Sequence, residues 1–205
     1  MPFFFQHQIN DNTRLGVWKI EETEEFFQLN VPRHRDVTHP HKRLQHLAGR
    51  FLLQLLFADF PFDLVRIADT RKPFLPDAQY QFSISHCGDF AAAIVSRDSR
   101  VGIDIEIPVE RMNKIRNRFL SPGEIEHFPL PGIEGLTLAW SVKETVFKWY
   151  GLGGIDFRDD IQLEQKDEAR QQVGFYFNKT QQHLFAEYRQ FPGLTLVWLD
   201  QKLEG

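Results

Sequence analysis

The chain has 205 residues, of which 42% are hydrophobic and 25% charged, the balance of an ordinary globular protein rather than of a disordered or fibrous one. Its formal net charge of −4 excludes the overall basic field of a protein that binds nucleic acid without sequence preference, so we expect no nucleic-acid partner. A single cysteine, Cys87, excludes a framework of intrachain disulfides and suits a reducing compartment.

Nothing in the sequence has the pattern of a leader or a membrane span. The opening residues, MPFFFQHQ, lack the basic and apolar regions of a secretory signal, and no later apolar run approaches the roughly 20 residues needed to cross a bilayer. We therefore expect a cytoplasmic protein with no membrane partner. The length allows one domain or two small, tightly packed halves.

The first part of the chain combines a hairpin, a helix and short strands. Residues 3–8 and 13–20 have strand composition and flank an Asn-Asp-Asn turn, which predicts an N-terminal hairpin. Pro40 precedes a long helical pattern of leucines and phenylalanines with a basic opposite face. Short β-like stretches bounded by turn residues follow at 64–68, 79–85, 90–96 and 101–107.

The second part repeats this mixture of elements. Ser121, Pro122 and Glu124 have the spacing of a capped helix start, which predicts a helix over 121–128. A longer helix is expected from about 133 to 150, ended by Gly151. The remaining predicted strands are 157–163, 172–177, 183–188 and 194–199. Helices and strands thus occur twice in similar amounts, which predicts an α+β fold made of two related halves.

Two carboxylates fall on one face of the predicted strand 101–107, VGIDIEI. Because successive side chains of a strand point to opposite faces, Asp104 and Glu106 share one face and the isoleucines the other. Neighbouring carboxylates repel unless water or a cation lies between them, and oxygen ligands suit a hard ion such as Mg²⁺. The alternative is the hydrated face of a half-exposed strand.

A second group of charges lies on the predicted helix 133–150, within the stretch WSVKETVFK at 140–148. At about 100° per residue, an apolar stripe forms on one side, and Glu144 and Lys148 lie one turn apart on nearly the opposite side. The apolar stripe consists of Leu138, Val142, Val146 and Trp149. The alternative for Glu144 and Lys148 is a solvent-facing ion pair, which would stabilise the helix by only about 0.3–0.5 kcal/mol.

Taken together, VGIDIE and, about forty residues later, WSVKETVFK resemble the paired signature of the 4′-phosphopantetheinyl transferase superfamily. Other features follow the order of its longer, Sfp-type members: the basic helix 42–50, the stretch RKPF at 71–74, and FSISHCGD at 82–89. The resemblance extends from about residue 40 to about residue 163. After Lys148 the sequence WYGLGG lacks a further basic residue found in many relatives.

This resemblance implies two pseudo-symmetric α/β halves with coenzyme A in the cleft between them: 1–98 on the adenosine and 3′-phosphate side, and 99–205 with the metal and catalytic motifs. Asp104, Glu106 and Glu144 would hold Mg²⁺, and Lys148 would contact the phosphates. A carrier-protein serine would attack the phosphate bearing the pantetheine arm and expel adenosine 3′,5′-bisphosphate. Either Glu144 or a metal-bound water would take the serine proton.

The resemblance also implies residues that bind coenzyme A outside the metal site. Ser85 and His86 match a Ser-His pair at the adenosine 3′-phosphate end, and Lys72 matches a basic position in the same region. Arg43 and Arg50 lie on the corresponding basic helix. The alternatives are a hydrogen-bonded turn histidine for His86 and a solvated helix face for the two arginines.

In this family the segment between the two motifs, 108–136, would dock the carrier protein. Its basic residues would steer an acidic carrier helix toward its apolar residues, although ordinary packing with a solvated basic face explains each residue equally well. The basic set is Arg111, Lys114, Arg116 and Arg118, and the apolar set is Ile115, Phe119, Leu120 and Phe128. The carrier could serve fatty-acid, polyketide or peptide synthesis, and we expect the transferase to be a monomer.

Two other functions remain open at this point. One is a different Mg²⁺-dependent phosphoryl or nucleotidyl transferase that uses the same three acids on a nucleotide triphosphate. The other is a non-catalytic relative that binds coenzyme A or carrier proteins. The combination of Asp104, Glu106, Glu144 and Lys148 argues against a simple binding module, which has no need of a charged metal site with a basic partner.

Overall fold

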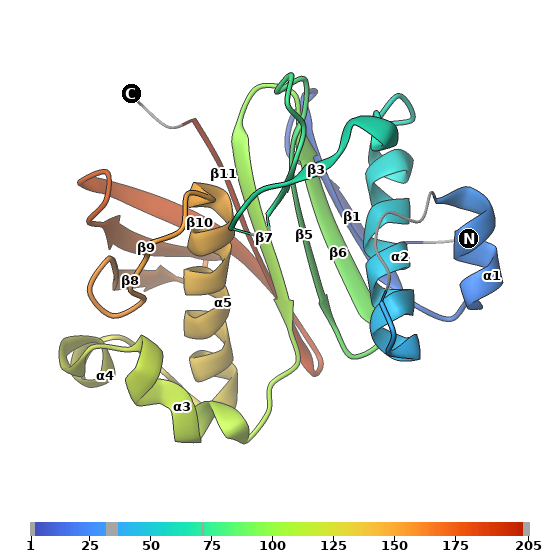
Figure 1. Ribbon diagram of the computed structural model, residues 1–205. Helices are drawn as coiled ribbons and strands as arrows, with labels where there is room; N and C mark the ends of the chain where they lie inside the picture. Colours follow the sequence, from blue (N-terminus) through green and yellow to red (C-terminus); the bar gives the residue numbers. More distant parts are fainter. Residues whose placement is uncertain (1–2, 32–36, 71, 203–205) are drawn as a thin grey trace. The chain divides into compact units, whose positions relative to one another are not determined.

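The computed structural model describes residues 3–31, 37–70 and 72–202, and has a mixed α/β architecture, as predicted (Figure 1). The chain forms two compact units, the first made of 1–103 with 200–205 and the second of 104–199. Arg71, the first residue of the RKPF stretch, lies outside the described residues. No helix in the described part of the chain is long and apolar enough to span a bilayer.

The first unit is built on a sheet with the strand order β1-β2-β6-β5, in which neighbouring strands are antiparallel. The predicted N-terminal hairpin is confirmed, with Phe5 opposite Val17, and a second hairpin turns at Gly88, whose φ of 47° suits a residue without a Cβ. The strands are β1 (Phe5–Gln8), β2 (Thr13–Lys19), β5 (Gln81–Cys87) and β6 (Phe90–Ser96).

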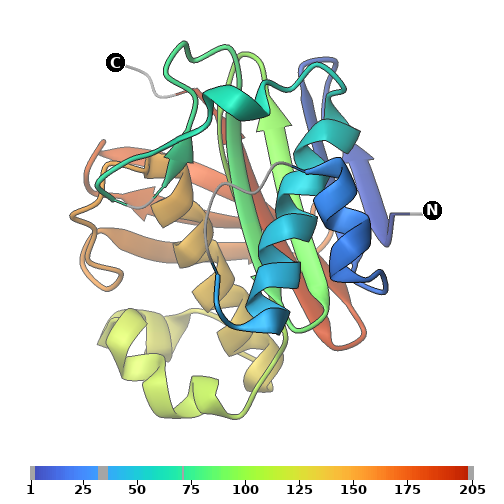
Figure 2. The same ribbon diagram turned by 45° about the vertical axis from the view of Figure 1, so that its right-hand side comes forward.

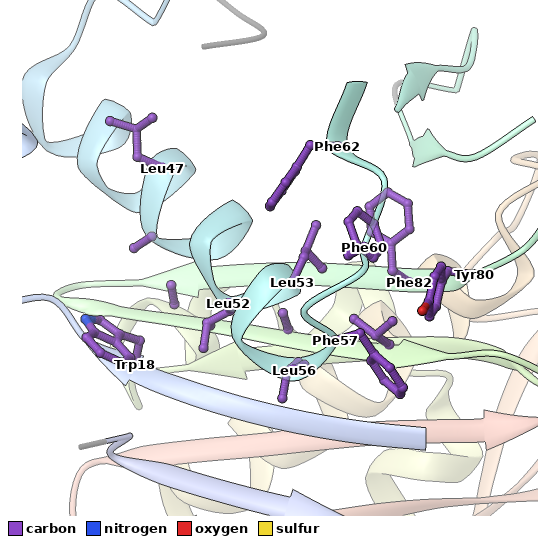
Figure 3. Close-up of a cluster of buried hydrophobic side chains, with 14 of the residues drawn as sticks. Trp18, Leu47, Leu52, Leu53, Leu56, Phe57, Phe60, Phe62, Tyr80 and Phe82 are labelled. Atoms are coloured by element: carbon purple, nitrogen blue, oxygen red, sulfur yellow. The ribbon is translucent and has the colours of Figure 1, made fainter. Parts of the chain in front are cut away.

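The long helix predicted after Pro40 is α2 (Pro40–Leu56), which packs on this sheet beside the shorter α1 (Glu24–Asn30). Figure 2 shows the two helices together on one side of the strands. Figure 3 shows Leu52, Leu53 and Leu56 on the side of α2 that faces the sheet, within a cluster rich in aromatic rings. Their apolar area is the main stabilising contribution of this unit.

The predicted strand 64–68 is mostly replaced by other structure. The chain forms a short 3-10 turn (Phe62–Leu64) and a two-residue ladder between β3 (Arg66–Ile67) and β4 (Pro73–Phe74). Arg66 and Ile67 are exposed, so no core face defines a longer strand here.

The second sheet has the strand order β7-β11-β10-β9-β8, and the boundaries between the two units fall within β7 and β11. The strand predicted at 157–163 begins only at Ile161, because Asp156 accepts hydrogen bonds from the backbone of Arg158 and Asp159 and closes a turn. The strands are β7 (Arg100–Glu106), β8 (Ile161–Asp167), β9 (Gln172–Phe177), β10 (Gln182–Phe191) and β11 (Leu194–Gln201).

The helices of the second unit are α3 (Arg111–Phe119), which the sequence reasoning did not predict, α4 (Pro122–His127) and α5 (Gly132–Tyr150). The predicted cap of α4 is confirmed: Ser121 Oγ accepts from the Glu124 backbone N–H at 3.2 Å, and the Glu124 carboxylate accepts from the Ser121 N–H at 2.7 Å. The predicted apolar stripe of α5 is buried, and the helix ends at Gly151 with a φ of 70°.

Candidate active site

The carboxylate face of β7 is covered rather than hydrated. Ile103 and Ile105 are fully buried on one face, and Asp104 on the other face is only 2% exposed. A helix–sheet layer normally holds apolar side chains, and a buried carboxylate needs partners to offset its desolvation. The alternative of a solvent-facing strand is therefore wrong for Asp104.

Lys148 of α5 supplies the main contact of Asp104. Its ammonium donates to Asp104 Oδ1 at 2.6 Å, and the Lys148 side chain is 23% exposed, while that of Asp104 is 3% exposed. The two motifs, 44 residues apart, thus meet in the second unit. Because one side of Lys148 still reaches solvent, this contact lies at the edge of the core.

Glu106, the last residue of β7, lies beside Asp104 and accepts a hydrogen bond from the indole of Trp140. The pKa of Glu106 is raised to about 7, first by burial and then by the Asp104 carboxylate, and the positive charge of Lys148 and the hydrogen bond from Trp140 only partly offset these effects. Near neutral pH this carboxyl is poised between its neutral and charged forms.

Glu144 lies between Trp140 and Lys148 on the same face of α5, because all three residues are spaced by four. Burial raises the pKa of Glu144, and the nearby Asp104 raises it further, against the opposing effect of Lys148. The solvent-facing pair considered for Glu144 and Lys148 is therefore replaced by a partly buried cluster on β7 and α5.

The carboxylate oxygens of Asp104, Glu106 and Glu144 are the kind of donor atom that binds a hard divalent cation. Within the described ranges, the structure has no ready-made group of three or more His, Cys, Asp or Glu side chains that could hold a metal ion. The Asp104 carboxylate nevertheless raises the pKa of both Glu106 and Glu144, and such repulsion between carboxylates is what a bound cation relieves. Carboxylate oxygens are the ligands that Mg²⁺ prefers.

Two further residues of this region were missed by the sequence reasoning. Trp140 packs edge-on against Phe119, at 5.2 Å between ring centroids, and so holds its indole toward Glu106. Lys143 is fully buried and pairs with Glu124 at 2.6 Å. The available signal was position: Lys143 precedes Val146 by three residues, which places it on the apolar side of the helix.

The predicted coenzyme A residues Ser85 and His86 lie on β5 in the first unit. Their side chains point to opposite faces of the strand, since Ser85 pairs with Ala92 and His86 with Ala91. His86 shares its face with Phe82 and Ile84, the face that α2 covers, and is exposed, whereas Ser85 is buried. They do not form a pair on one face.

The predicted basic residues have different surroundings. Arg43 is held by Glu24, with Nε to Oε1 at 2.7 Å, and its guanidinium also donates to the backbone oxygens of Val37 and Thr38. Arg50 is buried and donates to His46 at 3.2 Å. Burial lowers the pKa of Lys72 to about 8, with a smaller contribution from Arg100. The guanidinium of Arg43 is thus engaged in contacts within the protein.

The predicted carrier-docking segment contains α3. Its four basic side chains, Arg111, Lys114, Arg116 and Arg118, are all exposed, and the helix itself has no acidic residue. Of the apolar set, Phe119, Leu120 and Phe128 are buried and Ile115 is half-buried. The basic part of the prediction therefore lies on the surface, whereas most of the apolar part belongs to the core.

Comparison with known proteins agrees with the two motifs. Residues 100–196 match the family model of the 4′-phosphopantetheinyl transferase superfamily. Enterobactin synthase component D of Escherichia coli (strain K12) is 36% identical over 113 residues, which is 52% of this chain and 54% of that protein. The protein of the same name from Salmonella typhi is 34% identical over 138 residues, 63% of this chain and 54% of its own length.

A third relative is the 4′-phosphopantetheinyl transferase AcpT of Salmonella typhimurium, which is 29% identical over 116 residues, 54% of this chain and 60% of that protein. The chain thus spans about half the length of the curated relatives it matches. The resemblance inferred from VGIDIE and WSVKETVFK is confirmed.

Proposed function

Since residues 100–196 match the family model of the 4′-phosphopantetheinyl transferase superfamily, we propose that this chain transfers the 4′-phosphopantetheine arm of coenzyme A to a serine of an acyl or peptidyl carrier protein. The observation that carries the proposal is the 2.6 Å contact between Lys148 and Asp104, with Glu106 and Glu144 beside it. It brings both motifs of the family to one place in the second unit.

We further propose two pseudo-symmetric halves, 1–98 and 99–205, with the adenosine end of coenzyme A bound by the first and the pyrophosphate by the second. In support, each unit combines a sheet with one long helix, α2 or α5. In the first half, Lys72, Arg50 and His86 are the proposed contacts of the adenosine bisphosphate portion. Ser85 and Arg43 complete that set, although Arg43 would first have to give up contacts with Glu24.

In the second half, Asp104, Glu106 and Glu144 are the proposed ligands of Mg²⁺. A bound Mg²⁺ would supply positive charge that offsets the pyrophosphate and the developing charge of the leaving group. Lys148 would assist, because its partly exposed ammonium can exchange the Asp104 carboxylate for a phosphate oxygen. The carboxylates alone would repel coenzyme A, so an acidic site of this kind depends on the cation.

The proposed reaction forms a bond between the serine Oγ and the phosphorus that carries the pantetheine arm, and breaks the bond from that phosphorus to adenosine 3′,5′-bisphosphate. Glu144 is the proposed acceptor of the serine proton. Its raised pKa makes it a stronger base than an exposed glutamate. Burial of Asp104 and partial burial of Glu106 beside it keep bulk water from part of the site.

The proposed partner is an acidic carrier protein that docks on α3. Four exposed cations on a nine-residue helix, with no acid among them, give the electrostatic complement of an acidic helix. We place this reaction in the cytoplasm and expect a monomer, since a chain with two halves needs no second copy to supply one of them.

Mass spectrometry of an apo carrier protein incubated with the chain, coenzyme A and Mg²⁺ tests the proposal. The carrier should gain the mass of one phosphopantetheine group, and Asp104→Ala and Glu144→Ala should abolish the gain while the fold is retained. Hydrolysis of a nucleotide triphosphate without any gain would favour the rival phosphoryl transferase. Binding of coenzyme A with no turnover would favour a non-catalytic relative.

A further inference from the structure

A buried ion pair lies on the side of α5 away from the acidic cluster. Lys143 is 0% exposed and Glu124 only 5% exposed, and their charged atoms are 2.6 Å apart. Lys143 Nζ also donates to the backbone oxygens of Phe157 and Ile161, both at 2.7 Å. An ammonium has three hydrogens, so these partners use all of them.

Glu124 is equally well satisfied. One carboxylate oxygen accepts from the Leu163 backbone N–H at 2.9 Å, and the other accepts from the Ser121 N–H at 2.7 Å. The pair therefore ties the middle of α5 to the start of α4, to the turn at Phe157 and to the start of β8. A lysine so enclosed has no donor left for a phosphate, although it lies within the family motif beside Glu144.

Stability alone does not explain two buried charges, because a well-packed apolar pair of similar volume is often as stable or more stable. What a directional pair adds is a fixed orientation. The apolar stripe of α5 would tolerate small rotations of the helix, whereas three hydrogen bonds from one ammonium would not. With a helix radius of about 5–6 Å including side chains, a rotation of about 20° moves a side-chain tip by about 2 Å.

A chain of contacts also leads from Lys143 to the acids. Lys143 holds the backbone of Phe157, and the ring of Phe157 packs against Trp140, at 5.6 Å between centroids. Trp140 in turn donates its indole N–H to Glu106. The pair thus acts on Glu144 through the rotation of α5, and on Glu106 through Phe157 and Trp140.

We propose that Lys143 and Glu124 are positioning residues, which hold α5 in the rotation that directs Glu144 and Lys148 toward Asp104 and keep Trp140 against Glu106. The inference rests on the proposed function in that it takes these acids to be the metal site. Loss of groups that hydrogen-bond metal ligands directly typically weakens metal binding by 10–100-fold, and a rotation of α5 would displace a proposed ligand itself. Metal ligands must be held to within about 0.5 Å, which is well below the displacement of about 2 Å that a rotation of α5 by about 20° would cause.

The test uses the full chain and Mn²⁺ as the probe, with binding followed by electron paramagnetic resonance and folding by thermal unfolding. The variant is Lys143→Met with Glu124→Gln, which removes both charges so that neither is left buried alone. The matched control is Lys166→Met with Glu168→Gln, an ion pair at 2.9 Å in the same unit in which Glu168 is exposed. We expect Mn²⁺ affinity at least tenfold weaker in the first variant and unchanged in the control.

A folded first variant that binds Mn²⁺ as tightly as the unaltered chain would overturn the inference. If that variant does not fold, the Glu124→Asp variant decides instead, because it keeps the charge but shortens the side chain by one methylene. Mn²⁺ affinity equal to that of the unaltered chain would again overturn the inference. Carrier modification is measured in parallel. A chain that binds Mn²⁺ but modifies no carrier overturns the proposed function, while binding alone still decides this inference. A chain that binds no Mn²⁺ overturns both.

Discussion

Both units set a long helix on a sheet, but they fill the layer between helix and sheet differently. Under α2 the layer is apolar, with Leu52 and Leu53 against the small residues Ala91 and Ala93 of β6. Beside α5, part of the layer is ionic, and Asp104 of β7 meets Lys148. Similar architecture thus serves packing in one unit and charge placement in the other.

The difference between the two layers separates residues that stabilise the fold from residues that could take part in a reaction. An apolar layer gains free energy from every buried methylene, whereas buried charges must first offset their desolvation. The second unit carries that disadvantage at Asp104, Glu106 and Glu144, and compensates with a large apolar stripe on the same helix. We therefore expect substitutions in the two layers to affect different measurements.

The largest effect is expected on activity, from Asp104→Asn. The change keeps the shape but removes the charge that faces Lys148 and the proposed cation, so carrier modification should fall by at least about 10³-fold, equivalent to roughly 4 kcal/mol of transition-state stabilisation. Single-turnover mass spectrometry measures the loss, with Asp167→Asn on β8 as the control. Activity within tenfold of the unaltered chain would show that the ionic layer is structural only.

The next effect concerns the apolar layer. Leu52→Ala should destabilise the protein by about 2–5 kcal/mol, because it removes most of a fully buried side chain and leaves a cavity in its place. Leu55→Ala on the same helix is the matched control, since Leu55 is exposed and should lose less than about 1 kcal/mol. Urea unfolding compares them, and equal losses would contradict the assignment of the α2 face.

A smaller effect, of opposite sign, is expected from Glu106→Gln without divalent ions. The pKa of Glu106 is about 7 in the folded protein and 4.5 ordinarily, so the folded state binds more protons between these values and loses stability as the pH rises through them. Above pH 7 the variant should be more stable by roughly 1–2 kcal/mol, after allowance for the partial exposure of Glu106. Below about pH 4.5 the difference should vanish.

Unfolding free energies at pH 4.5, 6 and 8 measure this dependence. A stability gain that is the same at all three pH values would mean that the charge of Glu106 is not the source of the difference.

The smallest effect is expected at the helix cap. Ser121→Ala removes the acceptor for the Glu124 backbone N–H and should destabilise the protein by about 1 kcal/mol. Asn117→Ala, on the exposed face of α3, is the comparison and should change stability by less than about 0.5 kcal/mol. Thermal unfolding measures both, and a loss at Ser121 above about 3 kcal/mol would mean that the cap also governs the Lys143–Glu124 pair.

Local signals explain which elements could be predicted. The N-terminal hairpin, α2, the cap of α4 and the end of α5 at Gly151 all follow from turn residues, caps and periodicity within a few residues of each other. The short α1 and α3 were missed, since seven and nine residues carry little periodic pattern. The start of β8 was placed too early because side-chain contacts of Asp156 form the preceding turn.

For the candidate site, the sequence by itself determined which residues share a face: Asp104 with Glu106 on a strand, and Glu144 with Lys148 on a helix. Those periodicities are properties of the backbone and need no distant contact. Only the tertiary structure decided that Asp104 is buried against Lys148, that Trp140 bonds Glu106, and that Lys143 points away toward Glu124. Burial and charge pairing depend on which elements pack together, and no single segment contains that information.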